Sequence, residues 1–383
     1  MGDRTQRARI GEVDASLFGW VNHRKKSFES ILATYSMREF RYPPKPAPGD
    51  RVAVLSPSGR SAAYFPAPFE LGLRRLRDEF ELEPVEYPTT RAREASPEER
   101  ASDVEAAFAD PDIRAVLASI GGEDELKVLA FLDPAVPAAN PKPFFGFSDN
   151  TNLHLVLWNQ GLVSYHGGAV MVEFARPGSM HPLTRASLRR ALFTRETTTL
   201  APAGEFGDED RDWADPRSLE AAPTMFPAKG WSWHGPSAVV TGPAWGGSLE
   251  IVDFHLRTSR YLLPEDAYDG AVLFLETSEE LPSAAYVYRV LMAMGERGLL
   301  SRFAALLWAR PKAWSFEQPN SPEDKTRYVE AQREAVLRAV AEYNARIPVV
   351  WGVEFGHTDP QHVIPSGGTV TVDSIRRRID VTY

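Results

Sequence analysis

Short apolar segments alternate with amphipathic segments from residue 51 to residue 159, and this alternation constrains the fold most. Apolar or β-branched stretches predict strands at 51–55, 83–87, 113–120 and 144–147. Between them, apolar residues recur at helical spacing. One helix is predicted to begin at Ser96-Pro97-Glu98-Glu99, where Ser96 is the N-cap and Glu99 completes a capping box. Strands that alternate with helices in this way form a parallel sheet covered by helices on both faces.

The same pattern divides the chain into four parts. Residues 1–46 are expected to hold a helix and a proline-rich linker, and residues 47–195 a Rossmann-like domain. Residues 196–236 interrupt the alternation with acidic and aromatic residues, so they predict a long linker or loop. Residues 237–383 alternate again. The expected fold is therefore α/β, with a Rossmann-like parallel-sheet N-terminal domain and a smaller, mixed α/β C-terminal domain.

Individual elements outside the first domain follow from the same spacing. The apolar face of the N-terminal helix would consist of Leu17, Val21, Phe28 and Ile31. The strands and helices expected in the last part are 239–242, 271–276, 284–294, 304–308, 325–344, 369–372 and 378–381. The last two of these alternate like an antiparallel pair.

Composition excludes several classes of protein. The net charge of −9, from 43 basic and 52 acidic residues, argues against nucleic-acid binding, which normally needs a basic surface. Residues 1–12 are too polar for a signal peptide and no apolar run reaches about 18 residues, so we expect a cytoplasmic protein that does not bind membranes. The chain has no cysteine, so disulfides, thiolate nucleophiles and cysteine-based metal sites are excluded.

The segment from Phe144 to Thr151 carries the most chemical information. A buried strand leads directly into Ser148, and a helix begins at once. A serine on such a turn has its hydroxyl lifted out at the edge of the sheet, beside the first amides of the helix. Ser148 is therefore a candidate nucleophile. The alternative is that Ser148 or Asp149 only caps the helix, which is a common role for both residue types.

A serine nucleophile needs a base. Of the eight histidines, His357 lies in a loop between Gly356 and Pro360, after a predicted strand. His166 is the rival candidate, at the end of a strand near Ser148. His154 and His255 fall on predicted helices and are expected to be packing or surface residues.

The remaining parts of a hydrolytic site also have candidates. Glu276 ends a strand of four apolar residues, and if it is buried it needs a partner, as the acid that orients a base would have. Gly121 or Gly122, after the third strand, could supply a backbone amide that completes an oxyanion hole with the amide of Asp149. No histidine or acidic spacing typical of a metal site occurs, so neither a metal nor an organic cofactor is expected.

These segments together resemble the LD-carboxypeptidase family of serine peptidases, peptidase family S66, which includes the microcin C self-immunity peptidases. The matching motifs occur in the family's order between residues 46 and 383: Pro48-Gly49-Asp50-Arg51-Val52-Ala53-Val54-Leu55-Ser56-Pro57-Ser58, Ile120-Gly121-Gly122, Gly146-Phe147-Ser148-Asp149, Gly242-Pro243-Ala244-Trp245-Gly246-Gly247-Ser248-Leu249, Leu273-Phe274-Leu275-Glu276 and Phe355-Gly356-His357-Thr358. The resemblance implies that Ser148 is the nucleophile, His357 the base and Glu276 the orienting acid. It also implies a site between the two domains and a homodimer.

The substrate stays open at this point. Within the family, one class of enzyme removes a terminal D-amino acid from murein tetrapeptides. The immunity enzymes cleave the amide that joins a peptidyl aspartate to a nucleotide-like toxic group. The aromatic residues of the 196–236 segment could stack on a nucleobase, which favours the immunity type. A silent small-molecule binding protein is the alternative from another class.

The candidate substrate-binding residues are Phe226, Trp231, Trp233 and Trp245; Trp213 and His234 also lie in the 196–236 segment. These aromatic residues could instead only pin the segment to the body of the protein. Two features argue against the immunity type. Ser248 stands where the family often has asparagine, and the acidic run at 205–215 would repel a phosphate.

Overall fold

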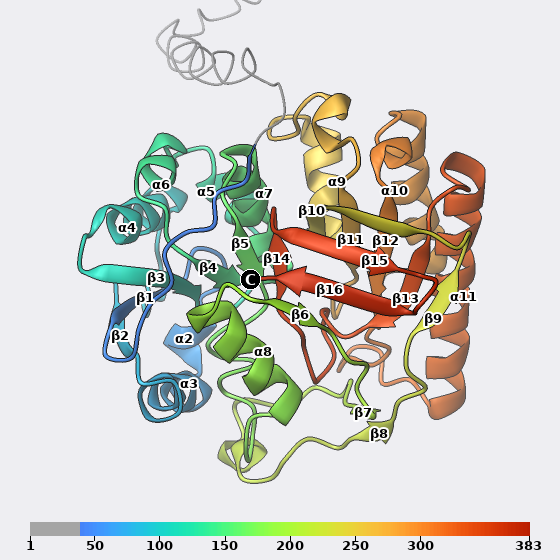
Figure 1. The fold of residues 1–383 in the computed structure, drawn as a ribbon. Helices are drawn as coiled ribbons and strands as arrows, with labels where there is room; N and C mark the ends of the chain where they lie inside the picture. The colour runs from blue at the N-terminus through green and yellow to red at the C-terminus, as the bar shows by residue number, and fades with distance from the viewer. Residues whose placement is uncertain (1–38) are drawn as a thin grey trace, which may run out of the picture. The chain divides into compact units, whose positions relative to one another are not determined.

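A mostly parallel sheet runs through residues 39–383, the part of the chain that this computed structural model describes (Figure 1). The helix predicted around Leu17 and Ile31 lies outside the described residues. The first half of the sheet is parallel in the order β2-β1-β3-β4-β5. Its strands are β1 (Arg51–Leu55), β2 (Glu83–Glu86), β3 (Ile113–Ala118), β4 (Phe144–Gly146) and β5 (Ser164–His166).

Helices connect these strands, as the alternation predicts, and α8 (Pro182–Phe193), which was not predicted, follows β5. The connecting helices are α2 (Ser61–Tyr64), α3 (Pro66–Asp78), α4 (Pro97–Ala109), α5 (Glu125–Val128), α6 (Ala135–Ala139) and α7 (Thr151–Asn159). The predicted capping box begins α4: the Ser96 side chain accepts from the Glu99 amide, and the Glu99 side chain accepts from the Ser96 amide. Every residue of α7 is buried, which fits its run of apolar side chains.

The second half of the sheet is built from β14 (Ile364–Ser366), β10 (Val239–Ser248), β11 (Val272–Glu276), β12 (Ala305–Ala309), β13 (Val349–Val353) and β9 (Ser232–His234), in that order. Helices α9 (Leu249–Thr258), α10 (Ala284–Glu296) and α11 (Pro322–Tyr343) accompany this half (Figure 1). The predicted antiparallel pair is present as β15 (Thr369–Asp373) and β16 (Arg378–Thr382), with β6 (Thr197–Thr199) on its outer edge.

The two halves are joined into one continuous sheet. β5 pairs antiparallel with β14, placing Tyr165 opposite Pro365, and β14 pairs parallel with β10 between Ser366 and Ala244. Residues 39–383 accordingly form one compact unit. The predicted α/β class with a parallel sheet is confirmed. The sequence motifs did not indicate that both predicted domains would share one sheet.

The segment at 196–236, which was predicted to be a linker or loop, is tied to the sheet at both ends. β6 pairs with β16, and β9 adds antiparallel to β13, so that Trp233 lies opposite Val350. Between them lie β7 (Glu205–Phe206), a 3₁₀ turn (Pro216–Leu219) and β8 (Phe226–Pro227). The acidic run does not simply face solvent, because Lys325 pairs with Asp208 at 2.7 Å and Lys312 pairs with Asp210 at 2.5 Å.

Within residues 39–383, no helix combines the length and the hydrophobicity that crossing a membrane requires.

Candidate active site

Ser148 lies on a strained turn between β4 and α7. Its φ of +59° is in the left-handed region, which residues other than glycine seldom adopt, and the 3₁₀ turn Ser148–Asn150 leads directly into α7. Gly121 lies directly against this turn, since a Cβ at position 121 would come within 2.8 Å of the Ser148 Cβ. The structure therefore brings the loop after β3 to the serine, as the sequence predicted.

The side chain of Asp149 stabilises the Ser148 turn through hydrogen bonds. One carboxylate oxygen accepts from the Ser58 hydroxyl and, at 2.9 Å, from the Glu125 amide, while the other accepts from Asn152 at 2.8 Å. Burial raises the pKa of Asp149, although the hydrogen bonds from Ser58 and Glu125 oppose that effect. Sequence reasoning considered the Asp149 side chain only as a helix cap and missed this role.

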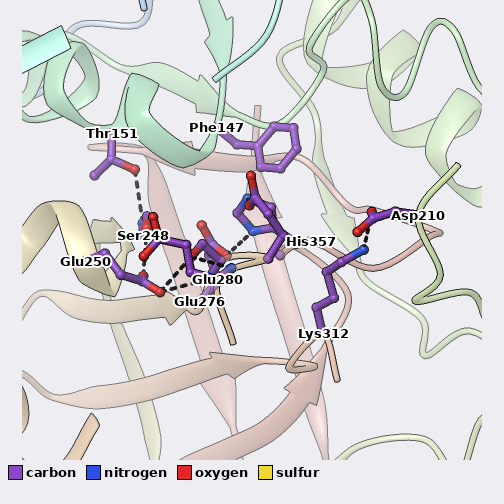
Figure 2. A network of polar contacts seen from close by, with 12 residues as sticks. Phe147, Thr151, Asp210, Ser248, Glu250, Glu276, Glu280, Lys312 and His357 are labelled. Atoms are coloured by element: carbon purple, nitrogen blue, oxygen red, sulfur yellow. Dashed lines mark hydrogen bonds and ion pairs between the residues drawn. The ribbon is translucent and has the colours of Figure 1, made fainter. Parts of the chain in front are cut away.

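Glu276 and His357 form a buried, hydrogen-bonded pair. Glu276 ends β11 and is fully buried, and its Oε2 accepts from His357 Nδ1 at 2.6 Å (Figure 2). The ring of Phe147, the residue before Ser148, packs on the His357 ring with the two centroids 5.0 Å apart. The predicted orienting acid and base therefore lie together, and both Ser148 and His357 line the same cavity.

The other nitrogen of His357 has a partner that the sequence analysis did not consider. Nε2 lies 2.9 Å from Oε2 of Glu279, in the turn after β11. Burial disfavours the charged ring, but the charges of Glu276 and Glu279 and the hydrogen bonds to both raise the pKa of His357 well above its usual value. Within residues 39–383, Ser148 and His357 share no hydrogen bond in this state. The only sequence signal for a role of Glu279 in the site is its position three residues after Glu276.

A cavity of about 800 Å³ opens over these residues. Ser58, Gly59, Gly121, Gly122, Ser148 and His357 form part of its wall, and residues 207–211, Trp213 and Phe316 form another part. Glu173, from the turn after β5, also lines it, and burial raises the pKa of Glu173 to about 8. Sequence reasoning mentioned Trp213 only as a member of the aromatic segment and did not consider Phe316 or Glu173.

The four aromatic residues proposed to bind substrate lie elsewhere. Trp245 is 1% exposed and stacks on Phe303, while Trp231 donates to Glu354 at 2.7 Å. Trp233 belongs to the edge strand β9, and Phe226 belongs to β8. None of the four is among the described residues that line the cavity. Trp231 and Trp233 attach the 196–236 segment to the body of the protein, whereas Trp245 is a core residue of β10.

The other three histidines weighed in the sequence analysis are engaged in packing. His166 is fully buried, its Nε2 lies 3.2 Å from the Phe355 carbonyl, and burial lowers its pKa well below the usual value. It is not one of the described residues that line the cavity. His154 lies between the Ser164 hydroxyl and the Gly146 carbonyl, and Nε2 of His255 lies 2.9 Å from Asn152 Oδ1, so both are buried packing residues.

Ser248 takes part in a hydrogen-bond network close to the Glu276–His357 pair (Figure 2). Its amide donates to the Thr151 hydroxyl at 3.0 Å and its hydroxyl donates to Glu250 at 3.0 Å (Figure 2). Glu250 in turn accepts from both the amide and the hydroxyl of Ser278. The serine at this position therefore links the start of α7 to the turn that carries Glu279.

Comparison with known proteins agrees with this architecture. A family model described as the LD-carboxypeptidase N-terminal domain matches residues 52–167, and one described as the C-terminal domain matches residues 241–372. A putative carboxypeptidase of Vibrio cholerae is 27% identical over 85% of this chain and 92% of its own length. The microcin C7 self-immunity protein MccF of Escherichia coli is 25% identical over 76% of this chain and 80% of its own.

A solved structure extends the likeness in fold. The structure of MccF in complex with glutamyl sulfamoyl guanosine covers 89% of this chain and 98% of its own, with a TM-score of 0.75 and 23% sequence identity. The two family models together match more than half of the chain, in the order in which the halves of the sheet occur. The chain therefore belongs to the LD-carboxypeptidase family of peptidases, family S66.

Proposed function

We propose that this protein is a serine hydrolase that cleaves an amide bond in a small peptide-like molecule. The observation that carries the proposal is the 2.6 Å contact between buried Glu276 and His357, because His357 lines the same cavity as Ser148 on its strained turn. A hydroxyl and an imidazole in one cavity, with a buried carboxylate bonded to the imidazole, form the set that nucleophilic amide hydrolysis needs. Membership of a peptidase family supports this reaction class.

Each residue then has a defined part in the reaction. Glu276 accepts the Nδ1 proton of His357, which leaves the Nε2 lone pair free to take the proton of Ser148. The Ser148 oxygen attacks the amide carbon, and the carbonyl oxygen becomes an oxyanion. The amides of Asp149 and of Gly121 or Gly122 would stabilise that charge. His357 gives its proton to the leaving nitrogen as the C–N bond breaks, and water then releases the acyl group from Ser148 by the same steps.

A peptidyl or aminoacyl nucleotide is the substrate class that we favour. Two aromatic side chains of the cavity wall, Trp213 and Phe316, support it, because aromatic faces stack on nucleobases. Asp208 and Asp210 are neutralised by Lys325 and Lys312, so the acidic run repels a phosphate less than its sequence suggested. The name of the family supports a second candidate, removal of the terminal D-alanine from a murein tetrapeptide.

Replacement of Ser148 tests the reaction class. We expect Ser148→Ala to lower kcat by about 10³- to 10⁶-fold and to abolish labelling by a fluorophosphonate probe, because the nucleophile is lost. Ser301→Ala, at an exposed serine outside the cavity, is the matched control and should behave like the wild type. Full activity of Ser148→Ala would exclude the proposed nucleophile. Binding without turnover or labelling in the wild type would favour a silent binding protein.

Two substrates separate the candidates within the enzyme class. One is an aminoacyl sulfamoyl adenosine, and the other is a murein tetrapeptide that ends in D-alanine. Cleavage of the first, measured by chromatography of the released sulfamoyl nucleoside, is the expected result. Release of D-alanine alone would replace the nucleotide-type substrate by the murein peptide.

A further inference from the structure

We infer that Glu279 is a specificity-determining residue that selects substrates with a free ammonium group on the carbon next to the scissile carbonyl. The inference rests on the proposed function, because it concerns the substrate of that same site. Its basis is the juxtaposition of Glu279 with His357 Nε2, 2.9 Å away, on the wall of the cavity that holds Ser148.

The contact between Glu279 and His357 is incompatible with the reaction. A carboxylate is only an acceptor, so it bonds Nε2 only while that nitrogen carries a proton. Nε2 must be unprotonated to accept the Ser148 proton. A neutral base would then direct its lone pair at the carboxylate of Glu279, and two acceptors repel each other. Glu279 must therefore exchange His357 for another donor when substrate is bound.

The side chain of Glu279 can change its hydrogen-bond partner, whereas the turn that carries it is held in place. The turn is fixed at Ser278, whose amide and hydroxyl both donate to Glu250, at 3.0 and 2.9 Å. In contrast, the Glu279 side chain is 56% exposed even while it contacts His357. Rotation about the side-chain bonds is enough to move the carboxylate from the base towards the bound substrate.

The nearby protein cation is already engaged. Lys312 contributes to the low pKa of Glu279, but its ammonium group is buried and bound to Asp210 at 2.5 Å (Figure 2). On the same wall, Arg176 is bound to Asp359 at 2.6 Å. A donor supplied by the substrate is therefore the natural new partner for Glu279.

The position of Glu279 indicates which substrate group this donor is. Nε2 must lie beside the Ser148 oxygen and the scissile carbonyl during the reaction, and Glu279 lies within hydrogen-bond distance of Nε2. A cation attached to the carbon next to that carbonyl would reach the carboxylate. An aminoacyl compound with a free α-ammonium group has such a cation, whereas an Nα-acylated peptide does not.

The test compares two substrates that differ only in this charge: alanyl sulfamoyl adenosine and its Nα-acetyl derivative. We would measure kcat/KM for both with the full chain as wild type, as Glu279→Gln and as Glu280→Gln. Glu280 is an exposed carboxylate next in sequence that does not line the cavity, so its replacement is the matched control. We expect the wild type and Glu280→Gln to prefer the free ammonium compound about tenfold or more, the size of one charge-assisted hydrogen bond, and Glu279→Gln to lose most of this preference.

Two outcomes would overturn the inference. One is an unchanged substrate preference in Glu279→Gln. The other is that Glu279→Gln cleaves both substrates faster by the same factor, which would mean that Glu279 only restrains His357. Calorimetric binding of both compounds to Ser148→Ala and to Ser148→Ala with Glu279→Gln gives a readout independent of turnover. If the wild type cleaves neither compound, the proposed reaction fails, while the ratio of the two dissociation constants still decides the role of Glu279. Equal affinities, or no binding of either compound, overturn that role.

Discussion

His357 lies between two carboxylates, and its titration sets the pH range in which the site can work. Its pKa is raised well above the usual value, since the charges of Glu276 and Glu279 outweigh the effect of burial. Because Nε2 must be unprotonated to act as a base, we expect kcat/KM to rise as the pH increases through this raised pKa. The other titratable groups around the ring are His166, whose pKa is lowered, and Glu173, whose pKa of about 8 makes it neutral below that pH.

The same shift predicts how stability depends on pH. The pKa of His357 is higher in the folded than in the unfolded chain, where it is about 6.5. Its contribution to stability is therefore complete below about pH 6.5 and is lost as the pH rises through the folded value. Denaturant unfolding at a series of pH values measures this loss. In Glu279→Gln, the loss should be smaller and the acid limb of kcat/KM should move to lower pH; profiles that match the wild type would contradict the explanation.

At the scale of elements, the loop after β3 and the turn after β4 leave no room for a side chain at position 121. A Cβ there would lie 2.8 Å from the Ser148 Cβ and 3.1 Å from its hydroxyl oxygen. We expect Gly121→Ala to displace the serine or the oxyanion-hole amides and to lower kcat by about 10²-fold. The stability cost should be about 1–3 kcal/mol, typical of overpacking.

Gly204→Ala is the control for this substitution, because a Cβ at Gly204 would meet no atom within 4 Å. Steady-state kinetics and thermal unfolding of both variants are the measurements. Wild-type kcat in Gly121→Ala would show that this loop does not position the nucleophile.

The segment that covers one side of the cavity is held by lysines of neighbouring elements. Lys325, on α11, pairs with buried Asp208 at 2.7 Å and with Glu209 at 3.2 Å. We expect Lys325→Ala to lower the free energy of unfolding by about 2 kcal/mol. The loss is smaller than for breaking a fully buried ion pair, because 17% of the Lys325 side chain is exposed. The unpaired acids should loosen residues 207–213, so that KM rises and limited proteolysis cuts there sooner.

A matched control lies on the same helix. Arg338 pairs with Glu342 at 2.9 Å, and both side chains are exposed, so Arg338→Ala should leave the free energy of unfolding almost unchanged. An equal effect of the two variants would mean that the Lys325 contact does not hold the segment.

At the scale of the whole molecule, the two halves share a sheet and buried polar contacts. β14 lies between β5 and β10, and the Trp158 indole of buried α7 donates to the Ala244 carbonyl at 3.1 Å. We therefore expect residues 39–383 to unfold in one cooperative transition, because neither half can lose its structure without exposing the other. Calorimetry should give equal calorimetric and van't Hoff enthalpies; two separate transitions would indicate independent halves.

Local patterns in the sequence were enough for much of the fold and for the centre of the site. The capping box at Ser96, the apolar run before Glu276 and the abrupt turn at Ser148 all depend on neighbours within a few residues, so they can be recognised without the tertiary structure. The aromatic side chains of the 196–236 segment could not be placed in this way. Whether a tryptophan faces a cavity or packs on a sheet depends on strand pairings such as that of β9 with β13. The homodimer and the substrate class stay predictions.

Local sequence patterns were sufficient for the α/β class, for most of the strands and helices, and for the candidate residues Ser148, Glu276 and His357, because hydrophobic period and turn chemistry are local properties. The tertiary structure decided three things. It joined the two halves through β14, it brought Trp213 instead of Trp231 to the cavity, and it placed Glu279 against the proposed base. Each is a contact between residues far apart in the chain, and such contacts are set by the packing of whole elements and not by the residues beside them.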